Sequence, residues 1–165
     1  MNKIAFILIF ALFAPFAAQA QSQRFEFFAG YAFHRVEGFP NNSNMSGWEG
    51  SLTYKFTPYL GVTADTSADY GTLTGSRINF HTIFVGPEVS LPHRISPFVH
   101  VLFGVSRASV FGQTSSVFST AIGGGVDYRF NRLISIRMIQ ADVITGATKS
   151  TSSDGRISTG IVFHF

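Results

Sequence analysis

The last six residues of the chain, GIVFHF (residues 160–165), carry the pattern that decides its fold. Ile161, Phe163 and Phe165 occupy every second position, and His164 is one of the residues between them. Successive side chains of a β-strand point to opposite faces, so this alternation predicts a strand with one continuous apolar face. The expected strand runs to the final residue of the sequence, which is itself aromatic.

The beginning of the sequence has the layout of an export signal. In MNKIAFILIFALFAPFAAQA (residues 1–20), a short basic stretch precedes an apolar run, and the small residues Ala18 and Ala20 follow it. We predict a secretory signal peptide that is cleaved after Ala20. A membrane-spanning helix is the alternative, but Pro15 interrupts the run, which is shorter than the roughly 20 residues that a bilayer requires. The remaining residues, 21–165, suffice for a single domain.

The composition is poor in charge and rich in aromatic residues. Charged residues make up 13% of the chain and aromatic residues 15%, whereas a typical soluble domain has roughly 25% charged residues. A small domain of this composition would have difficulty staying in solution. The absence of cysteine excludes disulfide bonds and thiolate chemistry. The basic residues are scattered singly rather than gathered in a stripe, so we expect no nucleic-acid partner.

Period-two alternation continues through the rest of the chain, and no segment after the signal peptide has convincing helical periodicity. The pattern predicts roughly eight strands, each of about nine to eleven residues, the length that crosses a bilayer at a tilt. The segments are RFEFFAGYAFH (24–34), WEGSLTYKF (48–56), YLGVTADTSADY (59–70), RINFHTIFVGPEV (77–89), PFVHVLFGVSRAS (97–109), SVFSTAIGGGVDYRF (116–130), LISIRMIQADVIT (133–145) and GRISTGIVFHF (155–165).

The two faces of these strands indicate a membrane. Trp48, Leu52 and Phe56 share one face of their segment, while Glu49 and Lys55 share the other. The narrow interior of a small barrel suits small and charged residues and cannot hold bulky groups from every strand. We therefore place the apolar faces against lipid and predict an all-β fold, an eight-stranded antiparallel up-and-down transmembrane β-barrel. It must close, because lipid offers no partner for unpaired backbone amides. A soluble lipocalin-like ligand-binding barrel is the alternative.

Aromatic residues gather near the two ends of the expected strands, as the girdles of membrane barrels do at the lipid–water boundaries. A general preference of aromatic residues for strands explains their number better than this clustering. The first set comprises Phe25, Phe27, Tyr54, Phe56, Tyr59, Phe98, Tyr128, Phe163 and Phe165, and the second comprises Tyr31, Phe33, Trp48, Tyr70 and Phe118.

The connections between the segments alternate between a shorter and a longer class. In outer-membrane barrels, short turns face the periplasm and longer loops face outward. An even number of strands then leaves both termini on the periplasmic side. The shorter class consists of TP (57–58), SLPHRIS (90–96) and NR (131–132), and the longer, polar class of RVEGFPNNSNMS (35–46), GTLTGS (71–76), VFGQTSS (110–116) and GATKSTSSD (146–154).

With these features the mature chain resembles the OmpA-like group of small eight-stranded bacterial outer-membrane barrels, in the porin-like superfamily. The stretch GGGVDYRF…ISIRMIQADV (residues 123–143) is similar to the paired sixth and seventh strands of that group, with Asp127, Arg137 and Asp142 as its polar landmarks. The resemblance covers the whole mature chain. It implies a place in the outer membrane of a Gram-negative bacterium, where the partners are membrane lipids and lipopolysaccharide. We expect a monomer.

The resemblance also gives the C-terminal alternation a meaning. In outer-membrane barrels a C-terminal aromatic residue preceded by alternating apolar residues is read by the barrel assembly machinery. The resemblance therefore implies that Ile161, Phe163 and Phe165 form the assembly signal of this chain.

Charged residues on the inward faces are expected to form a paired network in the lumen. An unpaired charge in so narrow an interior costs several kcal/mol. We expect contacts between Glu26 and Lys55 and between Asp127 and Arg137. The predicted network comprises Glu26, Glu49, Lys55, Asp65, Asp127, Arg129, Arg137 and Arg156.

The spacing of two of these landmarks conflicts with simple alternation. Arg137 and Asp142 are an odd number of positions apart, so an unbroken strand cannot turn both side chains inward. A β-bulge near residues 138–140 would reconcile them; otherwise Asp142 lies above the lipid zone. His34 and His100 are expected in the lumen, hydrogen-bonded to carboxylates.

An enzyme is the main alternative function, because lipid A deacylases and palmitoyltransferases of similar size are barrels of this outline. These acyl hydrolases and transferases use His with Ser and a carboxylate on the lipid-facing wall or outer rim. No histidine of this chain has a serine two positions away, and His81, the best rim candidate, lacks an obvious base partner. The histidines also lack metal-ligand spacing. We expect no metal and no other cofactor.

Two further functions are disfavoured. The glycines of GGG (residues 123–125) lie inside an expected strand rather than before a helix, so they do not form a phosphate loop. About eight strands leave an interior that side chains fill, whereas general-diffusion porins use roughly twice as many. We therefore predict a non-enzymatic integral outer-membrane β-barrel with a structural or surface-interaction role, whose lumen is plugged by the charged network rather than open.

Overall fold

The computed structural model describes residues 24–36, 43–73, 76–110, 113–146 and 153–165. The predicted signal peptide, with Ala18 and Ala20, lies outside these residues. No helix within the described ranges has the length and apolar character needed to cross a membrane. The strands are β1 (Phe25–Val36), β2 (Ser43–Lys55), β3 (Leu60–Leu73), β4 (Ser76–Ser90), β5 (Ile95–Val110), β6 (Gln113–Arg129), β7 (Ile134–Gly146) and β8 (Ser153–His164).

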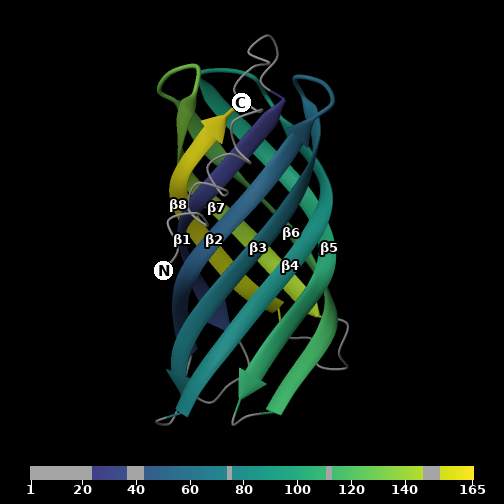
Figure 1. Ribbon diagram of the computed structural model, residues 1–165, viewed down its shortest axis with the longest axis vertical. Coiled ribbons are helices and arrows are strands. Elements are labelled where there is room, and N and C mark those ends of the chain that lie inside the picture. Colours follow the sequence, from purple (N-terminus) through teal and green to yellow (C-terminus); the bar gives the residue numbers. More distant parts are fainter. Residues whose placement is uncertain (1–23, 37–42, 74–75, 111–112, 147–152) are drawn as a thin grey trace, which may run out of the picture.

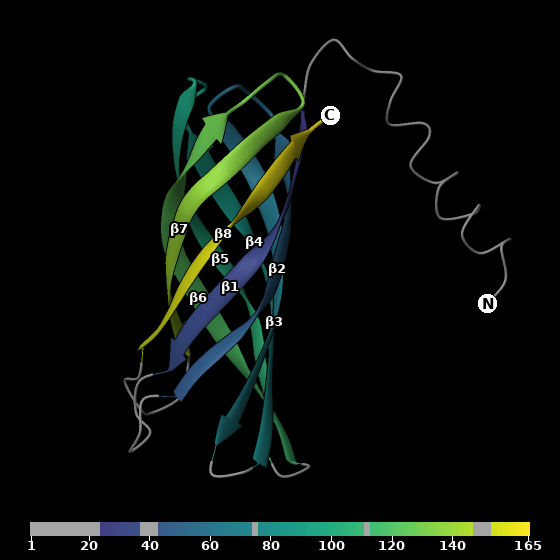
Figure 2. The same cartoon turned by 90° about the vertical axis from the view of Figure 1, so that its left-hand side faces the viewer.

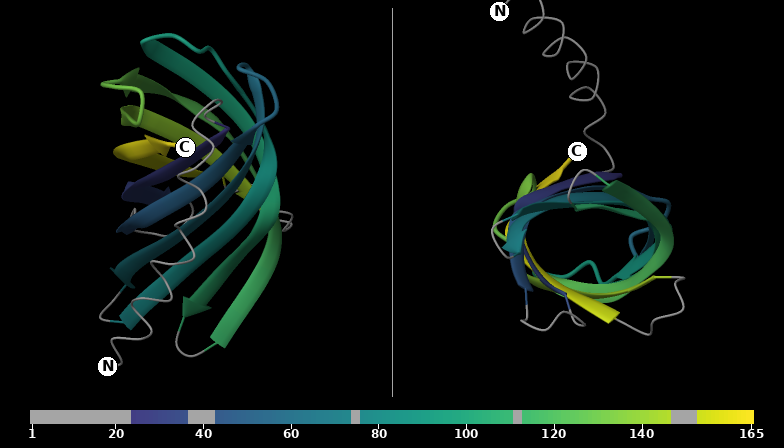
Figure 3. Two further views of the ribbon diagram at one scale, coloured as in Figure 1. Left: turned by 45° about the horizontal axis from the view of Figure 1, so that its top comes forward. Right: turned by 90° about the horizontal axis from the view of Figure 1, so that it is seen from below.

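The eight strands form one closed antiparallel barrel in sequence order (Figure 1). Each strand pairs with the next along the chain, and β8 returns to pair with β1, which completes the ring seen end-on in Figure 3. The predicted fold, an all-β, eight-stranded, up-and-down barrel, is confirmed. Its closure satisfies the backbone amides of every strand within the sheet, as a sheet in lipid requires.

The alternating segment 160–165 forms the closing seam of the barrel. Phe163 lies opposite Phe27 in the register of β8 with β1. Beyond the last ladder pair, the amide of Phe25 donates to the carbonyl of Phe165 at 3.2 Å, and the amide of Phe165 donates to the carbonyl of Phe25 at 2.8 Å. The terminal aromatic residue therefore extends the seam to the end of the chain.

One end of the barrel holds both the start of β1 and the finish of β8; we call it the terminal end and the opposite one the distal end (Figure 2). The turns at the terminal end, residues 56–59, 91–94 and 130–133, are short. Two of them are organised by polar side chains. Thr57 Oγ1 accepts from the Leu60 amide at 3.0 Å, and Asn131 Oδ1 accepts from the Ile134 amide at 2.7 Å. Such side-chain caps let the backbone reverse within four residues.

The strands are longer than the sequence analysis expected. They run from 12 to 17 residues, against the expected nine to eleven or so. GTLTGS and VFGQTSS were predicted as long loops, and this was wrong: only residues 74–75 and 111–112 separate the strands there. Ser and Thr continue the β-ladder readily, because Thr fits a pleated surface and both can bond across strands. β3 to β6 therefore extend well past the length that a bilayer needs.

All eight strands alternate between inward and outward residues, and a bulge interrupts the alternation of β7. On β1 and β2, Tyr31 and Trp48 are exposed on the outside, whereas His34 and Glu49 are buried inside. The outer wall is apolar around the whole circumference. It includes Tyr31 on β1, Leu52 on β2, Val62 on β3, Ile83 on β4, Val99 and Phe103 on β5, Ile122 on β6, Val143 on β7 and Ile161 on β8.

The inner wall is less uniformly polar than expected. Phe98 was assigned to the aromatic girdle, but it points inward and is 4% exposed. Its neighbours Pro97 and Val99 take the outward positions, and Phe98 shares the inward parity of His100, which was expected in the lumen. A small apolar layer also fills part of the lumen on the β4–β7 side; it consists of Phe84, Leu102, Ala121 and Ile144.

A β-bulge lies in β7 where the spacing of Arg137 and Asp142 required one. The register shifts between Arg137 and Gln140 against β8. Met138 and Ile139 are both exposed on the outside, so two residues of β7 face one of β8. This extra residue restores the parity that brings Arg137, Gln140 and Asp142 into the lumen together.

Candidate functional site

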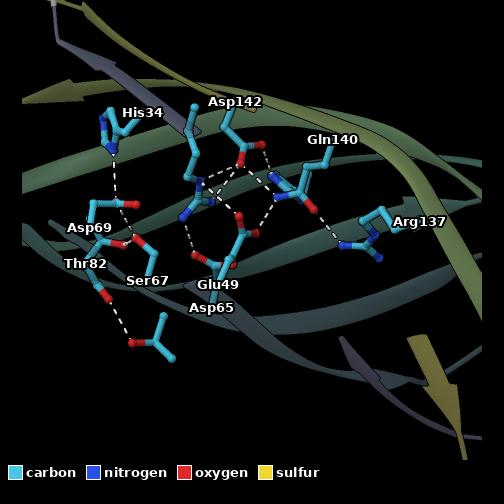
Figure 4. Close-up of polar contacts among 12 residues, drawn as sticks. His34, Glu49, Asp65, Ser67, Asp69, Thr82, Arg137, Gln140 and Asp142 are labelled. Atoms are coloured by element: carbon cyan, nitrogen blue, oxygen red, sulfur yellow. Dashed lines mark hydrogen bonds and ion pairs between the residues drawn. The ribbon is translucent and has the colours of Figure 1, made fainter. Parts of the chain in front are cut away.

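Arg156 on β8 is the centre of the polar lumen and is 1% exposed. Its guanidinium meets three carboxylates from three different strands. Nη2 lies 2.7 Å from Asp142 Oδ2 on β7, and Nη1 lies 3.0 Å from Asp65 Oδ1 on β3. Nε lies 3.4 Å from Glu49 Oε2 on β2. Because β3 lies opposite β7 in the ring of eight strands, this cluster spans the lumen (Figure 4).

Gln140 connects this cluster to a second arginine (Figure 4). Its amide nitrogen donates to Glu49 at 2.7 Å and to Asp142 at 2.8 Å, while its carbonyl oxygen accepts from Arg137 Nη1 at 2.6 Å. Arg137 in turn holds Asp127 through two parallel bonds, at 2.8 and 3.0 Å. Arg137 and Asp127 are register partners across the β6–β7 hairpin. The side-chain amide thus joins two ion-pair groups into one network.

Arg137 is also enclosed by aromatic rings. Its guanidinium carbon lies 4.4 Å from the ring centre of Phe28 and 4.1 Å from that of Phe98. Such cation–π contacts are strongest where water is excluded. Three glycines make room for the rings: a Cβ on Gly125 would meet Phe98, and one on Gly30 or Gly160 would meet Phe28.

A third group lies nearer the terminal end, around Lys55 on β2. Lys55 Nζ donates to Glu88 Oε1 at 2.6 Å and to Ser90 Oγ at 2.8 Å. Glu26, the expected partner, lies farther away at 3.6 Å. Glu26 also lies 3.4 Å from His164 Nδ1. Glu88 is therefore the principal partner of Lys55, and Glu26 lies between Lys55 and His164.

Two inward histidines each meet an aspartate. His34 Nδ1 lies 3.2 Å from Asp69 Oδ2 and His100 Nε2 lies 2.8 Å from Asp142 Oδ1. Ser67 continues the first of these groups toward the β4 wall (Figure 4). These contacts place both histidines in the lumen beside carboxylates.

Arg129 is the exception among the residues named for the network. It faces inward at the end of β6, but no ion pair joins it to any residue that the structure describes, and its buried Nε lacks a hydrogen-bond partner there. It lines a cavity at the terminal mouth instead. The other seven named residues, Glu26, Glu49, Lys55, Asp65, Asp127, Arg137 and Arg156, each lie within an ion-pair distance of at least one opposite charge.

Glu88 and Gln140 are among the lumen residues that sequence analysis missed. Glu88 shares the parity of Thr82 and Phe84 on β4, all of them buried, so alternation alone would have placed it inside. Gln140 carried no such signal, because the bulge at residues 138–139 reverses the parity of β7 at that point.

No constellation for catalysis or metal binding stands out in the described part of the chain. His81 lies on the outer wall of β4, where its ring meets Tyr70 edge-on with centroids 6.3 Å apart. Its register neighbours are Ala68 on β3 and Arg107 on β5. Among the described residues no three His, Asp or Glu side chains are grouped to hold a metal ion.

Comparisons with solved structures agree with this architecture. Neisserial surface protein A superposes with a TM-score of 0.72 at 16% identity, covering 86% of this chain and 97% of that one. This is the fold of the small eight-stranded outer-membrane barrels. The attachment invasion locus protein Ail of Yersinia pestis superposes with a TM-score of 0.59 at 20% identity, covering 86% and 97%. The N-terminal barrel of Pseudomonas aeruginosa OprF gives 0.62 at 15% identity, covering 88% and 100%. No protein-family model and no curated protein sequence matches the chain.

Proposed function

We propose that this protein is an integral barrel of the bacterial outer membrane that acts through its structure and its surface, without catalysis. The observation that carries the proposal is the apolar outer wall, which is continuous over all eight strands. The largest exposed apolar patch of a soluble monomer is typically about 300–600 Å². A wall of this kind around a closed barrel is stable only against lipid.

We further propose that the lumen is closed to solutes. The Arg156 cluster joins β2, β3, β7 and β8 across the interior, and the apolar layer that includes Phe84 and Leu102 occupies the β4–β7 side. Opening a path would require separating a guanidinium from three carboxylates in a narrow interior, which is costly. The network therefore acts as a plug that also ties opposite walls together.

The two ends of the barrel indicate its orientation in the membrane and its route of assembly. The three short turns lie at the terminal end, and short turns of outer-membrane barrels face the periplasm. We place both termini there, after removal of residues 1–20. Ile161, Phe163 and Phe165, on the seam with β1, would present the assembly signal to the barrel assembly machinery, and the finished barrel would be a monomer.

Lipopolysaccharide is the proposed partner at the distal end. His81 and Arg107 are register neighbours on the outer wall, and both are exposed. Arg107 lies only a few residues from the distal end of β5, where lipid phosphates would lie beside it. A structure of Ail of Yersinia pestis holds the heparin analogue sucrose octasulfate, so a barrel of this fold can present a polyanion-binding surface.

The membrane proposal is tested with the single tryptophan of the chain. Trp48 is 51% exposed on the outer wall, so in vesicles it should touch acyl chains. We expect brominated phosphatidylcholine to quench its fluorescence strongly, and the folded protein to migrate faster unheated than boiled on a gel. A monodisperse protein in plain buffer, with Trp48 insensitive to brominated lipid, would establish the soluble lipocalin-like alternative instead.

Two further measurements test the closed lumen and the absence of catalysis. Planar bilayers containing the barrel should show no stable ion conductance, and open channels would contradict the plug. Overexpression should leave the acyl pattern of lipid A unchanged. A changed pattern that disappears in His81→Ala would favour the lipid A acyl hydrolase or transferase.

A further inference from the structure

A cavity of about 380 Å³ opens at the terminal mouth of the barrel. It lies between the start of β1, the β2–β3 turn and the ends of β6 and β8. Its charged and polar lining consists of Arg24, Glu26, Lys55, Arg129 and His164. Its volume is at the lower end of the range of about 300–1,000 Å³ that is usual for small-molecule sites, so it suits a ligand of modest size.

The lining carries an excess of positive charge. Arg24, Lys55 and Arg129 contribute three cations and Glu26 one carboxylate, which leaves two positive charges with His164 neutral. Glu88 compensates Lys55 from the lumen side at 2.6 Å. Counted with Glu88, the mouth keeps one net positive charge.

Arg129 is the feature that distinguishes this cavity from the rest of the lumen. Arg137 and Arg156 are each held by carboxylates at 3.0 Å or less, whereas Arg129 has no ion-pair partner among the described residues. Its Nε is buried without a hydrogen-bond partner. A buried donor left unsatisfied is costly unless a ligand or water takes the bond. A guanidinium fork with free donors fits the oxygens of a phosphate group.

The rest of the cavity lining is mostly apolar. Phe56, Pro58 and Pro92 line it from the β2–β3 and β4–β5 turns. A ligand that fills the site would therefore place an anionic group against Arg129 and a ring or short carbon body against these three residues.

We propose that the terminal mouth is a binding site for a phosphate ester, whose oxygens match the unpaired guanidinium of Arg129. Arg129 binds the phosphate oxygens directly, with Arg24 adding charge at the rim and Lys55 at the floor. In the proposed orientation the site opens to the periplasm. The phosphate can come from a free ester or from a phospholipid headgroup of the inner leaflet; both present the same oxygens to the arginines.

The binding test uses the isolated barrel, so its outcome does not depend on where the protein lies in the cell. The full mature chain is folded in lauryldimethylamine oxide, a detergent without phosphate, and titrated by calorimetry with phenyl phosphate. Benzoate, with one negative charge, should bind more weakly, and uncharged benzyl alcohol should not bind. Arg129→Gln should weaken phenyl phosphate roughly tenfold or more, the effect of losing charged hydrogen bonds, and Arg129→Lys should restore part of it.

Arg132→Gln is the matched control, because Arg132 carries the same charge on the terminal turn beside β6 but does not line the cavity. It should change the affinity by about twofold or less, as expected for a solvent-screened charge. Faster gel migration before heating shows that each variant is folded. Equal losses in Arg132→Gln and Arg129→Gln, equal binding of benzyl alcohol, or no binding by the unaltered protein would overturn the proposal.

A second set of binding measurements, made in lipid, distinguishes the two sources of phosphate. The barrel in lauryldimethylamine oxide, which carries no phosphate, is compared with the barrel in nanodiscs containing phosphatidylglycerol. Loss of phenyl phosphate binding only in the second indicates that a headgroup occupies the site. Equal binding in both indicates a site for a free ester. Either result supports the phosphate site, provided that Arg129→Gln abolishes the effect.

Discussion

The two paired arginines of the lumen, Arg137 and Arg156, are held in different ways. Arg137 has one carboxylate, Asp127, bound through a two-bond fork, and its flat faces are covered by Phe28 and Phe98. Within the described part of the chain, Arg156 has no cation–π contact, and it meets three carboxylates from β2, β3 and β7. The first site is a local contact of one hairpin with aromatic walls. The second, called the junction below, is the cluster of Arg156 with Glu49, Asp65 and Asp142, and it connects opposite walls of the barrel.

This difference determines which site is more sensitive to change. Around Arg137 one positive charge balances one negative charge. Around Arg156 a single guanidinium faces three carboxylates, assisted by Gln140 and His100 as donors to Asp142. Removing the cation from the second site leaves more uncompensated negative charge in a narrower space, and the penalty of uncompensated buried charge is severe.

The largest effect is expected for Arg156→Met, which keeps the approximate length of the side chain and removes its charge. Three carboxylates then face one another, at a cost on the order of 3–5 kcal/mol. We would measure the free energy of unfolding by urea in phosphatidylcholine vesicles, with Trp48 fluorescence as the signal. Arg107→Met is the control, since Arg107 is exposed on the outer wall. An unfolding midpoint equal to that of the control would show that the junction does not stabilise the barrel.

A smaller loss is expected for Arg137→Met, about 1–3 kcal/mol. Asp127 loses its partner, but its side chain is 10% exposed near the terminal end, so water can reach it. Arg137→Lys tests the fork: it keeps the charge but not the planar pair of donors, and should recover only part of the stability. If Arg137→Met were as costly as Arg156→Met, the contrast between hairpin and junction would be wrong.

Phe98→Leu should cost still less, about 0.5–2 kcal/mol, because it removes one of two aromatic faces from Arg137. A double-mutant cycle sharpens the assignment. In the Arg137→Met background, Phe98→Leu should cost measurably less, since the cation is gone. Phe103→Leu, on the outer wall of the same strand, is the control. Strict additivity of the two changes would mean that the ring serves only as packing.

The smallest effect is expected for Glu49→Gln, with stability unchanged or slightly raised. It removes one of three carboxylates from a single guanidinium, and Glu49 Oε1 can still accept the bond from Gln140 through the amide oxygen. Asp142→Asn is the informative counterpart. Asp142 accepts bonds from Arg156, Gln140 and His100. The NH2 group of an asparagine at this position would face these donors and could not accept from them, so the unfolding midpoint should fall. Similar results for both variants would refute this ranking.

The sequence predicted what depends on neighbours along the chain. Alternation gave the inner and outer faces of most strand positions. The Asp127–Arg137 contact could be anticipated because the two residues lie on adjacent strands joined by a short turn. The sequence could not predict the cluster of three carboxylates around Arg156. Asp65 and Arg156 are 91 residues apart, and only the curvature of a closed barrel decides which side chains meet across its lumen.

Two local misassignments have equally physical causes. Phe98 looked like a girdle residue because it is aromatic and close to a strand end, yet the parity of β5 turns it inward beneath Arg137. The polar stretches after Tyr70 and Val110 looked like loops because Ser, Thr and Gly also form turns. In the structure the ladders extend into them, as far as the pairs Leu73–Ser76 and Val110–Gln113.

The bulge at Met138 and Ile139 makes the inner face of β7 tolerant of one change in length. Thr159 Oγ1 donates to the Arg137 carbonyl at this point, 2.9 Å away. On β8 the register partners of Arg137 and Gln140, which are Gly160 and Ser158, lie only two positions apart. Deleting either bulge residue would therefore leave a regular ladder in which Arg137 and Asp142, then four positions apart, still face the lumen.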